Sequence, residues 1–118
     1  MQFGESGHDV DSNATNHFSR VAKVTFDGPA NEIYLADGYG NKRVAVIDAT
    51  TGDLKRFWGA YGNVPSDDDL GAYDASTATQ QFRGPVHCAD PSDDGLVYVC
   101  DRGSDRVQVF QKDGTFVE

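Results

Sequence analysis

The same strand–turn–strand unit occurs twice in this chain of 118 residues. Its first copy runs from Tyr34 to Ile47, and its second copy runs from Tyr98 to Phe110 with one residue fewer. Each copy begins with an apolar strand that ends in Asp, continues through a polar turn to a basic residue, and closes with an alternating strand. A unit repeated on this scale is typical of architectures in which each copy packs against its neighbours.

Further short strands flank both copies. We expect strands at 21–26, 33–36, 43–48 and 54–58, and again at 86–89, 96–100, 106–110 and 115–117, with glycine-bearing turns between them. Four short antiparallel strands per unit predict an all-β chain built of β-propeller blades. We therefore expect one two-blade segment, in which blade one spans about 18–59, an inserted loop spans 60–81, and blade two spans about 82–118.

The turns and strand ends carry a recognisable pattern. Blade one reads Asp-Gly-Tyr-Gly-Asn-Lys-Arg at 37–43 and Phe-Trp-Gly at 57–59, and blade two reads Asp-Arg-Val-Gln-Val-Phe at 105–110. With Phe18 and Phe82 opening the two blades, this pattern resembles NHL repeats, the blades of propellers that are commonly six-bladed. The resemblance covers about two thirds of the chain. It implies a fold rather than a function, because one fold serves many functions.

Two blades leave two sheet faces without a neighbour. Read in sequence, residues 115–118 followed by 1–4 give Thr-Phe-Val-Glu-Met-Gln-Phe-Gly, which parallels the last strand of blade one at 53–59. We therefore predict that residues 1–4 of a neighbouring copy complete blade two. Three copies would then associate head to tail as a homotrimer with six blades. The alternative is that the chain is part of a longer polypeptide that supplies the other blades.

The charge balance excludes one class of partner. Ten Lys and Arg against 19 Asp and Glu give a formal net charge of −9, so we expect no nucleic-acid partner. No apolar run approaches the length of a membrane span, and no basic-then-apolar leader follows Met1. We therefore expect neither a membrane partner nor a signal peptide, and the compartment is left open.

Two cysteines fall on neighbouring expected strands. A hairpin between 86–90 and 96–101 is expected to place Cys88 opposite Tyr98, with Cys100 diagonally away. This offset allows a direct disulfide but favours two reduced thiols.

Antiparallel alternation gathers the unusual segments at one end of the sheets. These segments are the loops at 4–17 and 60–81, the turns at 37–42 and 101–105, and His87. Arg43 and Arg106 recur just before the third strand of each blade, and we expect them to pair with Asp residues of the blades. Loops beside a propeller channel are the first place to look for a binding site. The first functional reading is therefore a scaffold that binds a small molecule, a peptide or a protein.

A closer resemblance suggests a second reading. Asn16-His-Phe18, Asp37–Arg43, Phe57-Trp-Gly59, Pro85-Val-His87 and Asp101-Arg102 are similar to segments of the peptidyl-hydroxyglycine amidating lyase family, whose members are zinc-dependent NHL-type propellers. The resemblance implies that Tyr39 acts at a substrate hydroxyl, that Arg102 contacts substrate, and that His87 ligates zinc. In the family the proline and the histidine are adjacent, whereas in this chain Val86 lies between Pro85 and His87. A catalytic zinc usually has three protein ligands, so His87 from three copies would be needed to build a metal-dependent lyase or hydrolase.

Overall fold

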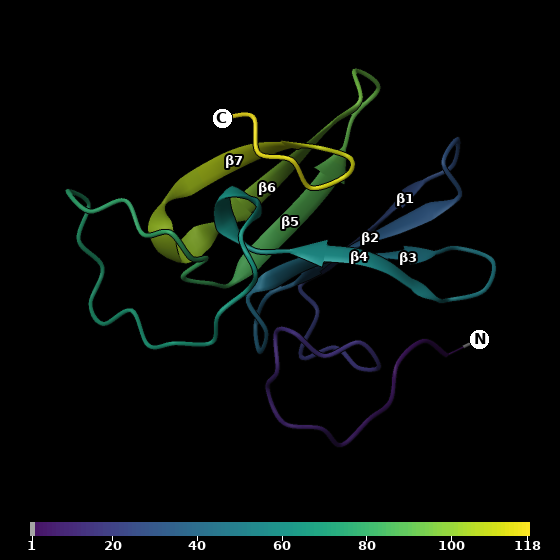
Figure 1. Cartoon of the computed structure of the whole chain (residues 1–118), viewed down its shortest axis with the longest axis horizontal. Coiled ribbons are helices and arrows are strands. Elements are labelled where there is room, and N and C mark those ends of the chain that lie inside the picture. The colour runs from purple at the N-terminus through teal and green to yellow at the C-terminus, as the bar shows by residue number, and fades with distance from the viewer. Residues whose placement is uncertain (1) are drawn as a thin grey trace.

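The computed structural model describes residues 2–118 and consists of two antiparallel β-sheets that share a core (Figure 1). The first sheet has four strands in chain order: β1 (Lys23–Asp27), β2 (Glu32–Asp37), β3 (Arg43–Asp48) and β4 (Leu54–Trp58). The second sheet has three strands, also in chain order: β5 (Val86–Pro91), β6 (Leu96–Asp101) and β7 (Arg106–Gln111). Short 3-10 turns follow β4 and β6: η1 (Ala60–Gly62) and η2 (Arg102–Ser104). The prediction of an all-β chain is confirmed.

The eighth expected strand, at 115–117, is reduced to a single bridge between Phe110 and Phe116. The segment still runs along β7, because Gln111 N donates to Thr115 O and Val117 N donates to Val109 O, at 2.8 Å each. The first four-stranded set is therefore complete, and the second ends after three strands and one bridge.

The core lies between the two sheets and follows from the period of two along each strand. From the first sheet it takes Tyr34, Ala36, Val44 and Val46, and from the second it takes Val97, Val99 and Phe110. These seven side chains are completely buried. The strands nearest to each other across the boundary are β1 and β2 on one side and β5 on the other.

The hairpin of β5 and β6 has a different register from the one expected. Cys88 lies opposite Cys100, and Tyr98 lies opposite Asp90. The two cysteines form a disulfide with their Cα atoms 4.9 Å apart, so the prediction of two reduced thiols is wrong. The turn is centred one residue later than expected, and this shifts the partner of Cys88 by two positions. Directly opposed side chains are the closest cross-strand neighbours, which brings the two sulfurs within bonding reach.

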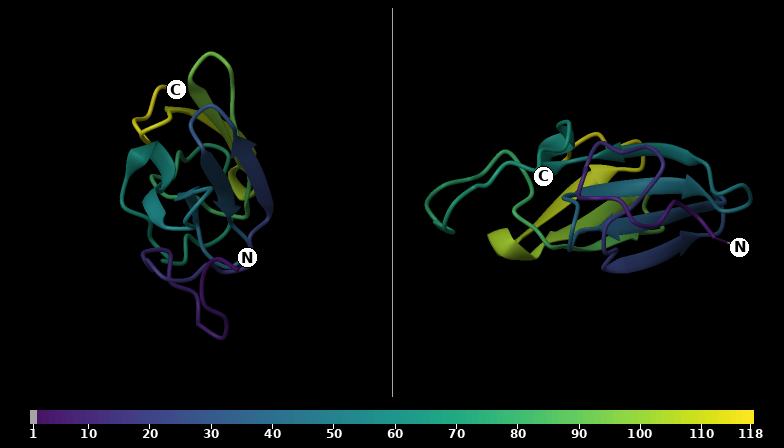
Figure 2. Two further views of the ribbon diagram at one scale, coloured as in Figure 1. Left: turned by 90° about the vertical axis from the view of Figure 1, so that its right-hand side faces the viewer. Right: turned by 90° about the horizontal axis from the view of Figure 1, so that it is seen from below.

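The two chain ends lie on opposite sides of the pair of sheets (Figures 1 and 2). Near the N-terminus, Phe3 and Phe18 pack against the outer face of the first sheet, where Leu35 and Ile47 are buried. The C-terminal segment lies along β7 on the far side of the second sheet. The long connection between β4 and β5 lies at the end of the sheets away from the β1–β2 turn. Within residues 2–118, no helix has the length and apolarity needed to cross a membrane.

Candidate functional site

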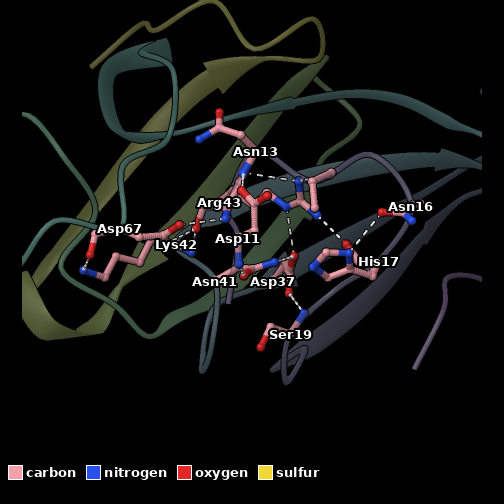
Figure 3. Close-up of polar contacts among 12 residues, drawn as sticks. Asp11, Asn13, Asn16, His17, Ser19, Asp37, Asn41, Lys42, Arg43 and Asp67 are labelled. Carbon is pink, nitrogen blue, oxygen red and sulfur yellow. Dashed lines mark hydrogen bonds and ion pairs between the residues drawn. The ribbon is translucent and has the colours of Figure 1, made fainter. Parts of the chain in front are cut away.

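A buried ion pair anchors the N-terminal loop to the first sheet (Figure 3). Asp37 ends β2 and Arg43 begins β3; both side chains are 0% exposed, and Arg43 Nε donates to Asp37 Oδ2 at 2.9 Å. The guanidinium also donates to three backbone carbonyls of the loop, those of Ser12, Ala14 and His17. The carboxylate in turn accepts the backbone N–H of Ser19 at 2.8 Å. The expectation that Arg43 pairs with a blade Asp is confirmed.

The inserted loop joins this network through Asp67. Its carboxylate accepts the backbone N–H of Ser12 at 2.8 Å and also bonds the Ser12 hydroxyl. The same hydroxyl accepts the backbone N–H of Lys42, and Lys42 Nζ donates to the carbonyl of Asp68 at 2.9 Å. The loops at 4–17 and 60–81 therefore meet at the turn 37–42, as the alternation of the strands predicts (Figure 3).

The second sheet repeats the anchor. Asp101 ends β6 and Arg106 begins β7, with Arg106 Nε 3.0 Å from Asp101 Oδ2. The Arg106 guanidinium donates to the carbonyls of Thr79 and Gln81 in the inserted loop, each at 2.9 Å. Asp101 accepts the backbone N–H of Arg83, as Asp37 accepts that of Ser19. Both arginines that recur in the sequence therefore hold loops in place.

Tyr39 and His87 meet at the same end of the molecule. Tyr39 lies in the β2–β3 turn of the first sheet, and His87 lies on β5 of the second sheet, where the register shifts between Val86 and Cys88. The Tyr39 hydroxyl is 3.1 Å from His87 Nε2, and the rings approach edge to face with their centroids 5.7 Å apart. Val86 is buried and His87 is exposed, so the extra residue after Pro85 directs the imidazole outward, toward Tyr39.

Arg102 stands apart from this pair. It lies in η2, where its backbone N–H donates to Pro85 O at 3.2 Å and its side chain is exposed. Within residues 2–118, no hydrogen bond or ion pair connects the Arg102 side chain to Tyr39 or His87. Gly38 occupies the equivalent position at the end of β2, where a Cβ would collide with the backbone of Val86 in the second sheet.

The residues that the structure describes, 2–118, bring no set of zinc ligands together. No group of three or more His, Cys, Asp or Glu side chains in the part of the chain that the structure describes is arranged to hold a metal ion. The donor set at His87 is one imidazole whose Nε2 already contacts Tyr39. A catalytic zinc usually takes three protein ligands, so the residues of one chain do not fit that ion.

The most strongly shifted pKa values lie away from the loops. Arg56 donates to both oxygens of Glu32 at 2.8 and 2.6 Å, and Lys55 adds a further contact at 2.6 Å. The hydrogen bonds from Arg56 are the main reason that the pKa of Glu32 falls to about 2. Burial raises the pKa of Tyr34, which contacts both Arg56 and Glu32, to about 12. Arg56 Nε also donates to the carbonyl of Lys112 at 2.7 Å, so this cluster links the first sheet to the segment after β7.

A cavity of about 260 Å³ lies where the loop at 60–81 covers the end of the second sheet. Its wall combines Arg83, Ser104 and Arg106 with Tyr61, Tyr73 and 75–79 of the loop. Sequence reasoning missed this feature, because a run of small residues such as Ala-Ser-Thr-Ala-Thr has no motif that indicates a cavity.

The fold and the site define an all-β protein made of two packed antiparallel sheets whose long loops are anchored at one end. No protein-family model matches the chain, and a comparison with curated proteins found no match either.

Proposed function

We propose that this chain is a two-blade segment of an NHL-type β-propeller and that it serves as a scaffold for binding small molecules or peptides at its loop-bearing end. The observation that carries the proposal is the pair of anchors, Asp37–Arg43 and Asp101–Arg106, which fix both long loops to the strand ends. A surface whose shape is set before binding loses less conformational entropy when a ligand arrives. Tyr39 and His87 are exposed at this end and present a hydroxyl and an imidazole to a ligand.

The repeat itself supports the propeller. Blade one covers blade two with Tyr34, Ala36, Val44 and Val46. In blade two, the repeat-equivalent residues lie on the uncovered outer face and are Tyr98, Cys100, Val107 and Val109.

The opposite face of blade two packs against blade one through Val97, Val99 and Phe110. In blade one, the residues equivalent to these three lie on its outer face and are Ile33, Leu35 and Ile47. Each outer face therefore carries the residue types of a blade interface that already exists in the chain.

The exposure of these faces agrees with that interpretation. Val44 is 0% exposed within the chain, whereas its counterpart Val107 is 57% exposed. On the outer face of blade one, Val24 and Phe26 are 61% and 63% exposed. Exposed apolar side chains gathered on one sheet face are typical of interaction surfaces.

The two chain ends occupy complementary parts of a last strand. The Phe3 ring lies against Gly52 of blade one, as the Trp58 ring lies against Gly114 of blade two. Phe116 bridges Phe110, as Leu54 pairs with Ile47 in blade one. Residues 2–4 therefore stand where a last strand ends, and 116–118 stand where one begins; Met1 lies outside the described residues.

From these equivalences we propose that three copies pack head to tail, with 116–118 of one copy in line with residues 2–4 of the next. The ring would have six blades. A longer polypeptide that supplies the other blades is the competing arrangement, and the mass of this chain in solution separates the two.

Peptide binding tests the scaffold proposal. The ¹⁵N-labelled protein is titrated with a set of short peptides that have free carboxyl ends, and amide shifts are followed by NMR. We expect the shifts to fall on the turn 37–42, on His87 and on the loops at 4–17 and 60–81. Shifts confined to the opposite end, around the β1–β2 turn at 28–31, would contradict a loop-face scaffold.

The second candidate is the metal-dependent lyase or hydrolase implied by the resemblance to the amidating lyases. The observation that favours it is the contact between Tyr39 and His87, two of the residues that the resemblance selects. In a three-fold ring the channel would receive His87 from each copy. Stoichiometric zinc in the purified protein, lost in His87→Ala, would support this candidate. A folded, metal-free assembly would rule it out and leave the binding scaffold as the proposed function.

A further inference from the structure

The cavity under the inserted loop is distinct from the Tyr39–His87 surface. Neither Tyr39, His87 nor Arg102 lines it. Its floor is the loop end of blade two, where Arg83, Ser104 and Arg106 lie, and residues 75–79 form its opposite wall. Because Arg106 holds the carbonyls of Thr79 and Gln81, the loop that closes the cavity is fixed in place.

The charge of the cavity is opposite to that of the chain. The protein as a whole has a formal net charge of −9, yet two arginines and no Asp or Glu line the cavity. Arg106 is neutralised by Asp101 at 3.0 Å. Arg83 makes no ion pair within residues 2–118, and its Nη1 donates only to the backbone carbonyl of Gly71 at 2.6 Å. The positive charge of Arg83 is therefore available to an anion.

Two buried donors in this wall have no partner. Arg83 Nε and Ser104 Oγ are both shielded from solvent, and neither finds a hydrogen-bond partner within residues 2–118. A buried polar group left unpaired destabilises the folded chain. A ligand that offers oxygen acceptors would pair with both groups once their side chains turn toward the cavity, whereas an apolar ligand would not.

The rest of the wall limits the size and kind of the ligand. The Arg83 guanidinium lies over the Tyr73 ring at 5.8 Å, and the Arg106 guanidinium lies over the Tyr61 ring at 5.2 Å. With Ala75 and Ala78, these rings give the cavity an apolar side. A volume of about 260 Å³ is just below the roughly 300–1,000 Å³ of pockets for drug-sized ligands, so the occupant is small.

We propose that this cavity binds a small organic carboxylate, with its carboxylate at Arg83 and Ser104 and a short apolar body against Tyr61, Ala75 and Ala78. Arginine suits this task because its planar fork matches the two oxygens of a carboxylate. This site goes beyond the proposed scaffold function, since it uses neither Tyr39 nor His87.

An NMR titration with sodium benzoate tests the proposal, with benzyl alcohol as the neutral analogue and inorganic phosphate as a second anion. We expect saturable benzoate shifts at 75–79 and Ser104, and no saturable shifts with benzyl alcohol. Arg83→Gln should weaken benzoate binding by roughly tenfold or more, as expected for a charge-assisted hydrogen bond. Ser104→Ala should weaken it a few-fold. Arg20→Gln, which removes the same charge from an exposed position, should leave it unchanged.

Three results would overturn the proposal. They are equal binding of benzoate and benzyl alcohol, unchanged benzoate affinity in Arg83→Gln, and phosphate binding as tight as that of benzoate, which would indicate a general anion site. Arg83→Lys keeps the charge but removes Nε and is measured in parallel. If Arg83→Gln does not fold, undiminished benzoate affinity in Arg83→Lys would overturn the role of the guanidinium fork. A scaffold that fails to bind peptides would leave these benzoate results unaffected, because benzoate binding depends on Arg83 and Ser104, whereas the peptide surface is defined by Tyr39 and His87.

Discussion

The Tyr39 hydroxyl lies 3.1 Å from His87 Nε2, although the two residues are 48 positions apart and belong to different sheets. The contact crosses the boundary between the two sheets at the loop-bearing end. Both side chains are exposed, so the contact contributes little to folding. Its position makes it the clearest candidate for recognising a ligand at this surface.

We expect Tyr39→Phe to weaken ligand binding at the loop face with little effect on stability. The free energy of unfolding in urea should change by less than about 1 kcal/mol, because the lost hydrogen bond is exposed. The matched control is Tyr98→Phe, which removes an exposed hydroxyl that bonds Asp94 near the β5–β6 turn. If Tyr39→Phe bound the same peptides with unchanged affinity, Tyr39 would have no role in recognition.

The Asp37–Arg43 pair should dominate the stability of the loop-bearing end. Asp37→Asn leaves Arg43 buried without its counter-charge, and we expect unfolding in urea to become easier by about 3–5 kcal/mol. Lys23→Gln, which breaks an exposed ion pair with Asp90, should cost less than about 1 kcal/mol. Equal, small effects of the two substitutions would show that the loops are not held by the buried pair.

Acid should destabilise the protein through Glu32. Its pKa is lowered from 4.5 to about 2 in the folded chain, chiefly by Arg56, and its side chain is only 8% exposed. Between these two values the unfolded chain binds more protons, so stability is fully present above pH 4.5 and falls as the pH drops toward 2. At neutral pH the lowered pKa of Glu32 contributes about 3 kcal/mol to the free energy of unfolding.

Urea denaturation at several pH values measures this dependence. Glu32→Gln should flatten the profile between pH 4.5 and 2, and it should also lower stability at neutral pH because Arg56 loses its partner. Asp68→Asn, at an exposed carboxylate, should leave the profile unchanged. A profile in Glu32→Gln as steep as that of the original chain would rule out Glu32 as its source.

The Cys88–Cys100 disulfide should stabilise the second sheet. It joins residues 12 positions apart, and closing a loop of about this length contributes roughly 2–3 kcal/mol. We expect the double substitution Cys88→Ser and Cys100→Ser to lower the unfolding free energy by about that amount. Intact-mass measurement with and without reductant checks that the bond forms. A mass that corresponds to two free thiols under oxidising conditions would contradict the register of β5 and β6.

Much of the fold could be predicted because it depends on local pattern. Alternation along the strands placed β2, β3 and β4 within a residue or so, and the recurrence of Arg43 and Arg106 indicated their structural pairing. The gathering of the loops at one end follows from antiparallel order alone.

What escaped prediction depends on single-residue offsets and on distant segments. The partner of Cys88 is decided by a turn centred one residue later than its sequence suggests. Phe3 packs against Gly52, but no sequence pattern within a single chain relates these two residues. The cavity at Arg83 exists only because the inserted loop folds back over blade two, and loop conformation leaves no periodic trace in sequence.

A substitution on the outer face of blade two examines how copies meet. Val107→Asp places a charge on an apolar side chain that is 57% exposed, so it should leave the chain folded while preventing head-to-tail packing. Val64→Asp makes the same change in the inserted loop and should have no effect on assembly. If both variants assembled like the original chain, the face at Val107 would not be an interface.

The most direct test of the paired outer faces is the mass of the unmodified chain in solution, measured by light scattering coupled to size-exclusion chromatography. The proposed ring predicts a folded particle of about three times the 12.8 kDa of one chain. A folded, soluble monomer of 12.8 kDa at micromolar concentration would contradict it.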